Sequence, residues 1–297
     1  MNKLLRIGLA IILIGVGLVV VFGLISGENF FSYVSDDSSY TYVEKTYTED
    51  EFSMFDISLI NRKVIILPST DSEVKITYYE SEKDYFIVEE DGSTLQIVNE
   101  EKWFSNWFDF NWFSNPDIYE FYLYLPDTMG LDLDLHTSNG TITVSDLTEF
   151  GILNLSSSNG EITLENVEST GNITLLTSNG ALNATGVISL GNIKFTTTNG
   201  RILVNGMTSD NVDLKSTNGV IDCSNIYSDL LEVDTSNGNI EINVPGAFTD
   251  FYLSMSTTNG NYYLNGDEVT TNSYHDSASK SINCHTSNGN IRVNFSN

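Results

Sequence analysis

The sequence is poor in the residues and motifs on which enzyme active sites are usually built. It has 297 residues but only two cysteines, Cys223 and Cys284, and three histidines, His136, His275 and His285. It has no CxxC pair, no HExxH motif, no phosphate-binding P-loop, no dinucleotide-binding glycine fingerprint and no Ser-His-Asp order. We therefore expect a protein that is not an enzyme and carries no cofactor or metal.

Basic residues are also scarce. The chain has 13 Lys and Arg against 40 Asp and Glu, which gives a formal net charge of -27. Such a field repels phosphate backbones, so we expect no nucleic-acid partner. It attracts divalent cations and basic partners, although the simpler interpretation is that acidity keeps an exposed domain soluble.

One stretch lacks charge altogether, residues 7–26. A helix of this length crosses the ~30 Å hydrocarbon layer of a bilayer. Lys3 and Arg6 precede it and acidic residues follow, which predicts a cytoplasmic N-terminus and an extracytoplasmic remainder. A cleaved signal is the alternative, but its apolar part is normally only about 7–15 residues long. We expect residues 1–27 to form a signal anchor, a transmembrane helix that places a single-pass protein in the cell membrane.

The most regular feature of the chain is a corner motif of two hydroxyl residues followed by Asn-Gly. Successive asparagines are 20, 20, 20, 19, 19, 22 and 29 residues apart. The eight pairs are Asn139-Gly140, Asn159-Gly160, Asn179-Gly180, Asn199-Gly200, Asn218-Gly219, Asn237-Gly238, Asn259-Gly260 and Asn288-Gly289. Eight corners in one phase indicate a structural repeat.

Apolar residues recur at fixed offsets from each corner asparagine. They stand six and four residues before it and three and five residues after it, as in Leu153, Leu155, Ile162 and Leu164 around Asn159, with mostly polar residues between them. This alternation predicts two short strands per repeat, each with one buried face. Because a repeat of this size cannot bury its own apolar face, we expect the repeats to stack in an all-β solenoid.

The competing fold is a β-sandwich of hairpins with type I′ Asn-Gly turns. That fold does not explain the two hydroxyl residues before every corner, whereas stacked repeats let identical polar side chains form hydrogen-bonded ladders. We expect the corner Asn-Gly pairs to supply the positive φ that the corners require.

The segment YLPDTMGLDLDLHTSNGTITV and the repeated SNGxIxL units resemble the DUF4097 family of "putative adhesins", also called the toastrack domain. The resemblance runs from about Tyr42 to Asn297. It implies a right-handed β-helix-like solenoid, often held by one transmembrane helix in a bacterial envelope and sometimes associated with envelope-stress systems. It implies no reaction and no catalytic residues.

After the anchor we expect three regions. Residues 28–50 form a polar stalk, residues 51–130 form N-terminal strands that cap the solenoid, and residues 131–297 form the solenoid itself. The period breaks at residues 265–280, where we expect a surface loop.

The capping region contains an aromatic loop at residues 103–116. Its rings are Trp103, Phe104, Trp107, Phe108, Phe110, Trp112 and Phe113. Aromatic rings among polar neighbours suit binding interfaces, so this loop is the candidate binding site for an envelope protein or glycan. Two alternatives remain: the rings enter the membrane interface, or they close the end of the solenoid core.

Acidic residues share outward columns on neighbouring repeats. Asp213 and Glu232 form one column and Asp222 and Glu241 another, with Asp234 beside them. Carboxylates ~4.8 Å apart bind Ca²⁺ or are solvated, and the absence of the glycine-rich calcium repeat favours solvation.

The cysteines and two of the histidines are expected to be far apart. Cys223 and Cys284 fall in inward columns about three repeats apart, roughly 14 Å, which is too far for a disulfide and favours buried free thiols. His136 and His285 occupy one outward position in the first and last repeats.

Together these features predict a non-catalytic, membrane-anchored envelope protein, an adhesin-like binding or scaffold module. The alternative is a carbohydrate-active β-helix enzyme that uses outward acids such as Asp213 or Asp222, although the repeats carry few basic residues to assist them.

Overall fold

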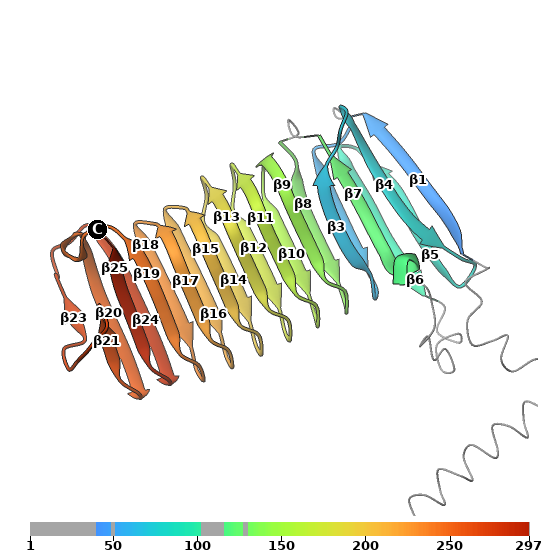
Figure 1. Cartoon of the computed structure of the whole chain (residues 1–297). Helices are drawn as coiled ribbons and strands as arrows, with labels where there is room; N and C mark the ends of the chain where they lie inside the picture. The colour runs from blue at the N-terminus through green and yellow to red at the C-terminus, as the bar shows by residue number, and fades with distance from the viewer. Residues whose placement is uncertain (1–39, 49–50, 102–115, 127–129, 297) are drawn as a thin grey trace, which may run out of the picture.

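Two large β-sheets face each other along the whole length of a flattened rod (Figure 1). The computed structural model describes residues 40–48, 51–101, 116–126 and 130–296. One sheet, called sheet A here, has 13 strands, and the other, sheet B, has 12. The predicted all-β solenoid is confirmed.

The strands of each sheet are given in their order along the rod. Sheet A contains β1 (Thr41–Thr48), β4 (Glu73–Glu80), β7 (Glu120–Leu125), β3 (Lys63–Pro68), β9 (Ile142–Phe150), β11 (Ile162–Ser169), β13 (Leu182–Ser189), β15 (Ile202–Thr208), β17 (Ile221–Tyr227), β19 (Ile240–Pro245), β25 (Ile291–Ser296), β21 (Tyr262–Leu264) and β22 (Asp267–Val269). Sheet B contains β5 (Asp84–Asp91), β6 (Thr94–Glu101), β2 (Met54–Leu59), β8 (Asp132–Thr137), β10 (Leu153–Ser157), β12 (Ile173–Thr177), β14 (Ile193–Thr197), β16 (Asn211–Ser216), β18 (Leu230–Thr235), β24 (Lys280–Asn288), β20 (Phe251–Asn259) and β23 (Ser273–Tyr274). Two short 3₁₀ helices, η4 (Pro116–Tyr119) and η5 (Phe248–Asp250), complete the described elements.

Each repeat forms one coil: a strand of sheet B, an Asn-Gly corner, and a strand of sheet A. Equivalent strands pair in parallel and in register, so that Leu153 lies opposite Ile173 in sheet B and Ile162 lies opposite Leu182 in sheet A. This parallel pairing rules out the hairpin sandwich for the repeats, because hairpin strands pair antiparallel.

The four apolar columns predicted from the sequence face inward and fill the space between the sheets. Leu155, Leu175 and Phe195, for example, follow one another along sheet B and are all fully buried. Tyr262 and Leu264 are only half-buried, because they lie on β21 in the outermost coil. One continuous apolar core therefore runs along the rod.

The coils do not stack entirely in chain order. The last coil, β24 and β25, lies between the coil of β18 and β19 and the coil of β20 and β21. The simple stacking of each repeat on the one before it is thus wrong for the final two repeats. The chain first builds the outermost coil and then returns to fill the space that it left.

Residues 265–280, expected to be a surface loop, contain two short strands. β22 pairs antiparallel with β21, and β23 pairs antiparallel with β20. These strands form the edges of both sheets at this end of the rod, and edge strands this short offer little backbone for pairing with another chain.

The other end of the rod is built from two more coils and three antiparallel strands. β2 and β3 form a coil that pairs in parallel with β8 and β9, and β6 and β7 form a coil outside it. β4 and β5 pair antiparallel with β7 and β6. Here too the chain returns: the outer coil of β6 and β7 comes later in the sequence than the inner one.

Part of the predicted polar stalk is a strand. Residues 41–48 form β1, which pairs antiparallel with β4 along its full length. Val43 and Tyr47 pack against the core, Lys45 between them is half-buried, and Glu44 and Thr46 face solvent. The segment was interpreted as a stalk because polar residues dominate it, but alternate apolar residues suffice for an edge strand.

The predicted anchor, residues 1–27, lies outside the described residues. Within the described part of the chain, no helix is long and apolar enough to span a bilayer.

Candidate functional site

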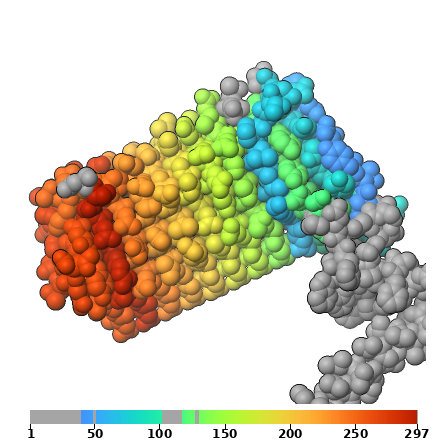
Figure 2. Space-filling view, in the orientation of Figure 1, coloured from blue at the N-terminus to red at the C-terminus, as the bar shows by residue number. Residues whose placement is uncertain are grey.

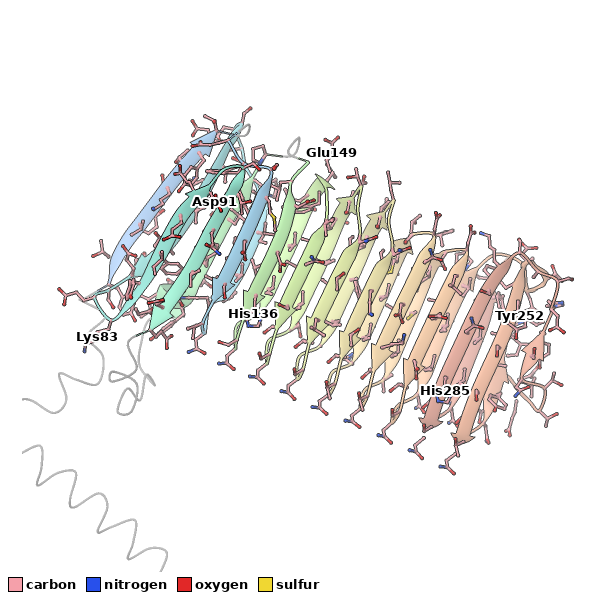
Figure 3. All side chains as sticks on the ribbon, turned by 180° about the vertical axis from the view of Figure 1, so that it is seen from behind. Lys83, Asp91, His136, Glu149, Tyr252 and His285 are labelled. Atoms are coloured by element: carbon pink, nitrogen blue, oxygen red, sulfur yellow. The ribbon has the colours of Figure 1, made fainter. Side chains whose placement is uncertain are left out.

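The corner asparagines form one hydrogen-bonded ladder along an edge of the rod (Figure 3). Each side-chain Nδ2 donates to the Oδ1 of the asparagine in the adjacent coil; the distance is 2.7 Å from Asn179 to Asn159 and 2.8 Å from Asn199 to Asn179. In spatial order the ladder runs through Asn61, Asn139, Asn159, Asn179, Asn199, Asn218, Asn237, Asn288 and Asn259. Amide chains of this kind polarise one another and fix the register of the coils.

A buried hydroxyl completes each corner. Thr177 Oγ1 donates to the carbonyl oxygen of Gly160 in the preceding coil at 3.0 Å and accepts the N–H of Gly180 at 3.1 Å. Thr197 makes the same two bonds one coil further on. The first hydroxyl residue of the motif thus satisfies backbone groups in two coils that would otherwise be buried without partners.

The corner glycines are required for a reason other than the one expected. Among the described residues, glycines with positive φ occur elsewhere, and the corner glycines are not among them. A Cβ on Gly180 would instead lie 1.8 Å from the carbonyl oxygen of Gly160, so each glycine makes room for the backbone of its neighbour. The same close approach holds, with contacts of 1.5–2.0 Å, at Gly140, Gly160, Gly200, Gly219, Gly238, Gly260 and Gly289.

Positive φ occurs in a second column, at the position inside each of these sheet A strands that the pairing with the neighbouring strand skips. Its members are Asp146, Asn166, Gly186, Gly206 and Asn225. Asn and Asp are the non-glycine residues that adopt this conformation most readily. The corners and these skipped positions therefore use asparagine and glycine for different physical reasons.

The aromatic loop cannot be placed in the structure. Trp103, Phe104, Trp107, Phe108, Phe110, Trp112 and Phe113 all lie outside the described residues. Its role in binding a partner stays a prediction.

A different group of aromatic residues lies on the outer face of sheet A, on strands β1, β4, β7 and β3. These strands belong to the blue-to-green end of the rod in Figure 2. We call it the tyrosine platform and define it as Tyr42, Tyr79, Tyr122, Tyr124, Ile65 and Leu67. All six point away from the core, because the residues that alternate with them are inward-facing. Ile65 lies beside Tyr122, and Leu67 beside Tyr124, on paired strands.

The rings of the platform contact one another in pairs. Tyr122 and Tyr124 are nearly parallel, with ring centroids 6.0 Å apart and planes at 8°. Tyr42 and Tyr79 meet edge to face at 5.5 Å, and Tyr42 is 50% exposed. The ammonium group of Lys75 lies 4.9 Å from the ring centroid of Tyr124, within the range of a cation–π contact.

A charged pair, Lys63 and Glu120, lies at the edge of the platform. Glu120 accepts hydrogen bonds from Lys63 Nζ at 2.7 Å and from Tyr122 Oη at 2.6 Å. Burial opposes ionisation of Glu120, but these two donors outweigh it and lower the carboxyl pKa. The bond to Glu120, together with partial burial, raises the pKa of Tyr122 to about 12. The phenol therefore stays protonated and keeps its hydrogen bond to Glu120 across the physiological range.

Behind the platform, a buried ion pair joins the segments of this end. We call it the Arg62 clamp. Arg62 is 1% exposed, and its Nη2 contacts Asp84 Oδ2 at 2.5 Å while its Nη1 donates to the carbonyl oxygen of Ile118 at 2.8 Å. Asp84 also accepts bonds from Asn99 and from Tyr40 Oη.

The clamp is desolvated on all sides that the structure describes. The Arg62 guanidinium lies 5.3 Å from the ring centroids of both Phe86 and Tyr119. Burial, together with the nearby charge of Asp84, raises the pKa of Tyr40. Such a buried pair is structural in character, and it ties Tyr40, the first described residue, to the first coils.

The acidic columns lie where the sequence placed them, on outer faces. Asp213 is the register partner of Glu232 in sheet B, and Asp222 is that of Glu241 in sheet A. Lys215 contacts Asp213 at 3.0 Å, and this hydrogen bond raises the lysine pKa. Within the described residues, no group of three or more His, Cys, Asp or Glu side chains is arranged to hold a metal ion.

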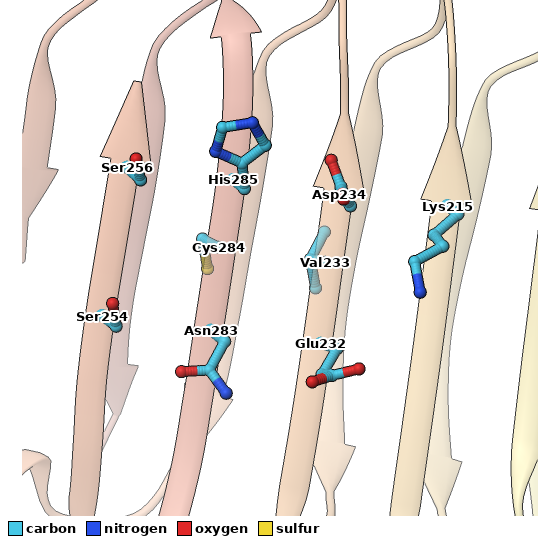
Figure 4. A pocket seen from close by; sticks show the side chains of 9 residues that line it. All are labelled: Lys215, Glu232, Val233, Asp234, Ser254, Ser256, Asn283, Cys284 and His285. Atoms are coloured by element: carbon cyan, nitrogen blue, oxygen red, sulfur yellow. The ribbon is translucent and has the colours of Figure 1, made fainter. Parts of the chain in front are cut away.

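A hollow of about 320 Å³ opens on the outer face of sheet B near these acids (Figure 4). Its outward side chains come from β16, β18, β24 and β20: Lys215, Glu232, Asp234, Asn283, His285, Ser254 and Ser256. The hollow arises where the small serines of β20 follow the longer side chains of β18 and β24. It places His285 between its register partners Asp234 on β18 and Ser256 on β20.

His136 and the two cysteines do not come together in a site of their own. His136 lies on β8 and His285 on β24 of the same sheet, with β18, β16, β14, β12 and β10 between them, so the two are far apart as expected (Figure 3). Cys223 and Cys284 are buried free thiols, and burial raises the pKa of both. They are two coils apart rather than three, because the last coil is inserted next to β18 and β19.

Sequence reasoning missed the tyrosine platform and the clamp. The platform had a signal: the segments YTYVEK and EFYLYL place tyrosines at alternate positions, where the repeats have Thr, Asn or acids. The clamp had none, because Arg62, Asp84 and Asn99 are far apart in the sequence and each looks like a surface residue.

Comparison with known proteins identifies the family. No curated protein matches the chain. Among solved structures, a "putative adhesin" from Bacteroides fragilis is 12% identical, with a TM-score of 0.45 and coverage of 89% of this chain and 99% of the other. A "putative lipid binding protein" from Parabacteroides distasonis is 14% identical, with a TM-score of 0.44 and coverage of 86% and 97%. Likenesses this distant say nothing about what this chain binds. The Toastrack DUF4097 family model, however, matches residues 52–294, so the chain belongs to that family.

Proposed function

We propose that this protein is a non-catalytic, membrane-anchored rod that displays binding surfaces outside the cell membrane, as an adhesin does. The observation that carries the proposal is the unbroken stack of coils, whose interior is filled by apolar side chains and whose corners are fixed by ladders. Such a stack is stiff and offers its chemistry on outer faces. A stiff body with a membrane segment at one end suits a spacer or display function.

The location can be tested with a single cysteine. Ser178 is exposed at a corner, whereas both native cysteines are fully buried and have raised thiol pKa values, so they should not react. We expect Ser178→Cys in the full chain to react with a membrane-impermeant maleimide on intact cells, and the unsubstituted chain to stay unlabelled. Labelling that occurs only after lysis would contradict an extracytoplasmic rod.

The binding role is tested by capture of envelope material with the full chain. We expect binding that does not alter the captured molecules, and the triple change of Trp103, Trp107 and Trp112 to Ala tests whether the aromatic loop contributes. Undiminished capture by a folded triple variant would remove the loop from the proposal. Turnover of an extracellular polysaccharide, lost in Asp222→Asn or Asp213→Asn, would instead support the enzyme alternative.

A link to envelope stress rests on the family resemblance alone. It predicts that deletion of the gene changes the induction of the envelope-stress response. An unchanged response in the deletion strain would leave the protein a binding or scaffold module only.

A further inference from the structure

We propose that the tyrosine platform binds a neutral, extended polysaccharide whose sugar rings lie over the tyrosine rings. This inference rests on the proposed surface-binding function and names the ligand class for one face of the rod. The starting observation is a local difference: outward positions on the repeats carry mainly Thr, Asn, Ser and acids, whereas four tyrosines and two aliphatic residues gather over β1, β4, β7 and β3.

The platform has the mixed chemistry that a sugar requires. Pyranose rings present apolar C–H faces and hydroxyl edges, so they need apolar area interrupted by hydrogen-bonding groups. The rings of Tyr122 and Tyr124 provide nearly parallel apolar surfaces, flanked by Ile65 and Leu67. Tyrosine suits such a surface because its ring is apolar and its hydroxyl is wet.

The hydrogen-bonding groups are already oriented. The Lys63 side chain is 50% exposed and is held by Glu120, whose other oxygen is held by Tyr122. Tyr42 Oη is similarly bonded to Glu44 at 2.8 Å. Charged groups fixed in this way lose little further conformational entropy when they bond to sugar hydroxyls, and hydrogen bonds to charged groups are the stronger ones.

The dimensions fit a chain rather than a single sugar. The platform crosses four neighbouring strands of one sheet, and three strand spacings of ~4.8 Å give about 14 Å. The surface is an open sheet face, not a closed pocket, so a polymer can extend past it in both directions. An extended polysaccharide therefore matches it better than a monosaccharide.

The charges of the chain disfavour two other classes of partner, polyanions and lipid surfaces. The chain carries a net charge of -27, which disfavours polyanions such as nucleic acids and acidic glycans. A lipid surface would have to desolvate Lys63, Lys75, Glu44 and Glu120, which stand among the rings, and burial of charges is costly. A neutral polymer meets neither penalty.

The test uses the full chain in a detergent without a sugar headgroup. Binding of cello-oligosaccharides and chito-oligosaccharides is measured by calorimetry, with polygalacturonate and anionic lipid vesicles as competing ligand classes. We expect wild-type protein to bind a neutral oligosaccharide, more tightly as the oligosaccharide lengthens. Tyr122→Ala and Tyr124→Ala should each weaken binding about tenfold, and Tyr124→Phe, which keeps the ring, should retain most of it.

Tyr263 provides the matched control at the other end of sheet A. It is an outward, half-buried tyrosine with a cation over its ring, Arg292 at 4.7 Å, just as Tyr124 has Lys75. Tyr263→Ala should bind like wild type, and unchanged thermal unfolding will show that the platform variants are folded.

Several results would overturn the inference. These are no neutral oligosaccharide bound by the wild type, equal weakening in Tyr263→Ala, unaffected binding in folded Tyr122→Ala and Tyr124→Ala, or preference for polygalacturonate or vesicles. If the full chain still captures envelope material while neutral glycans fail to bind, only the platform assignment fails. If capture fails as well, the proposed surface-binding function falls with it.

Discussion

The repeated coils and the first N-terminal coil turn at equivalent corners that differ in their residues and in their backbone, because Asn61 has a φ of 55° whereas none of the eight repeat asparagines has a positive φ. In the repeats, each corner glycine makes room for a backbone carbonyl of the neighbouring coil, namely the neighbour that lies nearer to the N-terminal end of the rod. The coil of β2 and β3 has Asn61-Arg62 at this place; Gly140 packs against the Arg62 carbonyl, while Asn61 begins the ladder. The sequence has no Asn-Gly pair before Asn139, so no corner glycine precedes Arg62. Within the described residues, the first corner of the row carries a large side chain in place of glycine.

The two regions also differ in the size and variety of their side chains. Small residues make the repeats uniform, with each coil held by the next through backbone contacts and ladders. Arg62 stands where the repeats have glycine, and its buried side chain forms the clamp with Asp84 at the N-terminal end of the rod. The tyrosine platform occurs in the same region. Uniform coils supply stiffness, and the irregular end supplies the distinctive chemistry.

The largest effect should come from breaking a corner of the repeats. Gly180→Ala places a methyl group 1.8 Å from the Gly160 carbonyl oxygen, and that oxygen belongs to paired backbone that cannot shift alone. We expect a loss of more than about 5 kcal/mol, or no folded protein. The control is Gly130→Ala, where the new methyl group would be 3.6 Å from its nearest neighbour. Equal stability of the two variants in denaturant unfolding would refute the explanation of the corner glycines.

Removing the charge of the clamp should have the next largest effect. Arg62→Met leaves Asp84 buried without its cation, which typically costs about 3–5 kcal/mol. Breaking the exposed pair between Lys280 and Asp229 with Asp229→Asn should cost less than about 1 kcal/mol. Thermal unfolding of both variants measures the contrast, and a mild Arg62→Met phenotype would show that the N-terminal end is not held by the clamp.

A corner hydroxyl should matter less than a corner glycine. Thr177→Val keeps the shape but leaves the Gly160 carbonyl and the Gly180 N–H without that partner, a cost of about 1–3 kcal/mol. Thr174→Val on the outward face of the same strand should change stability by less than about 0.5 kcal/mol. Denaturation midpoints that fall together would show that the buried hydroxyl has no special role.

The smallest expected effect is on how the melting temperature changes at alkaline pH when Tyr122 of the platform is replaced. Because the folded pKa of Tyr122 is about 12 against an ordinary value of 10, the unfolded state loses its proton first as pH rises. The stabilisation is full below pH 10 and is lost between pH 10 and about 12. Burial raises the pKa of Tyr40 and Tyr78 in the same direction. Melting temperatures should thus fall above pH 10, slightly less steeply in Tyr122→Phe; an identical slope would contradict the role of Glu120.

The periodic part of the fold could be predicted from sequence because the same physical demand recurs in every coil. The inward columns and the ladder residues follow from their spacing alone. The coil of β2 and β3 obeys the same offsets, since Phe55, Ile57, Val64 and Ile66 flank Asn61 at the four expected positions and are all buried. It was missed because its corner lacks glycine and the preceding hydroxyl residues.

Other features could not be derived from the spacing. The spacing lengthens to 22 and 29 residues at the last two repeats, but it does not give the order of stacking, because any coil with the same columns can stack on any other. The reason for the corner glycines was misjudged because sequence reports which residue is present, not whether φ or a close contact demands it. The candidate site depends on which alternate residues face outward on strands brought together from distant segments.

The inserted final coil has a consequence for how the molecule is completed. A chain delivered N-terminus first can build the rod in sequence as far as β19, but the coil of β20 and β21 has its place only once the last residues arrive to fill the space beside it. The C-terminal segment thus lies inside the stack and joins the outermost coil to the rest of the rod. Loss of that segment would leave the hydrocarbon interior open to water part-way along the body, so a prematurely terminated product should be recognised and degraded as a misfolded protein rather than persist as a shorter rod.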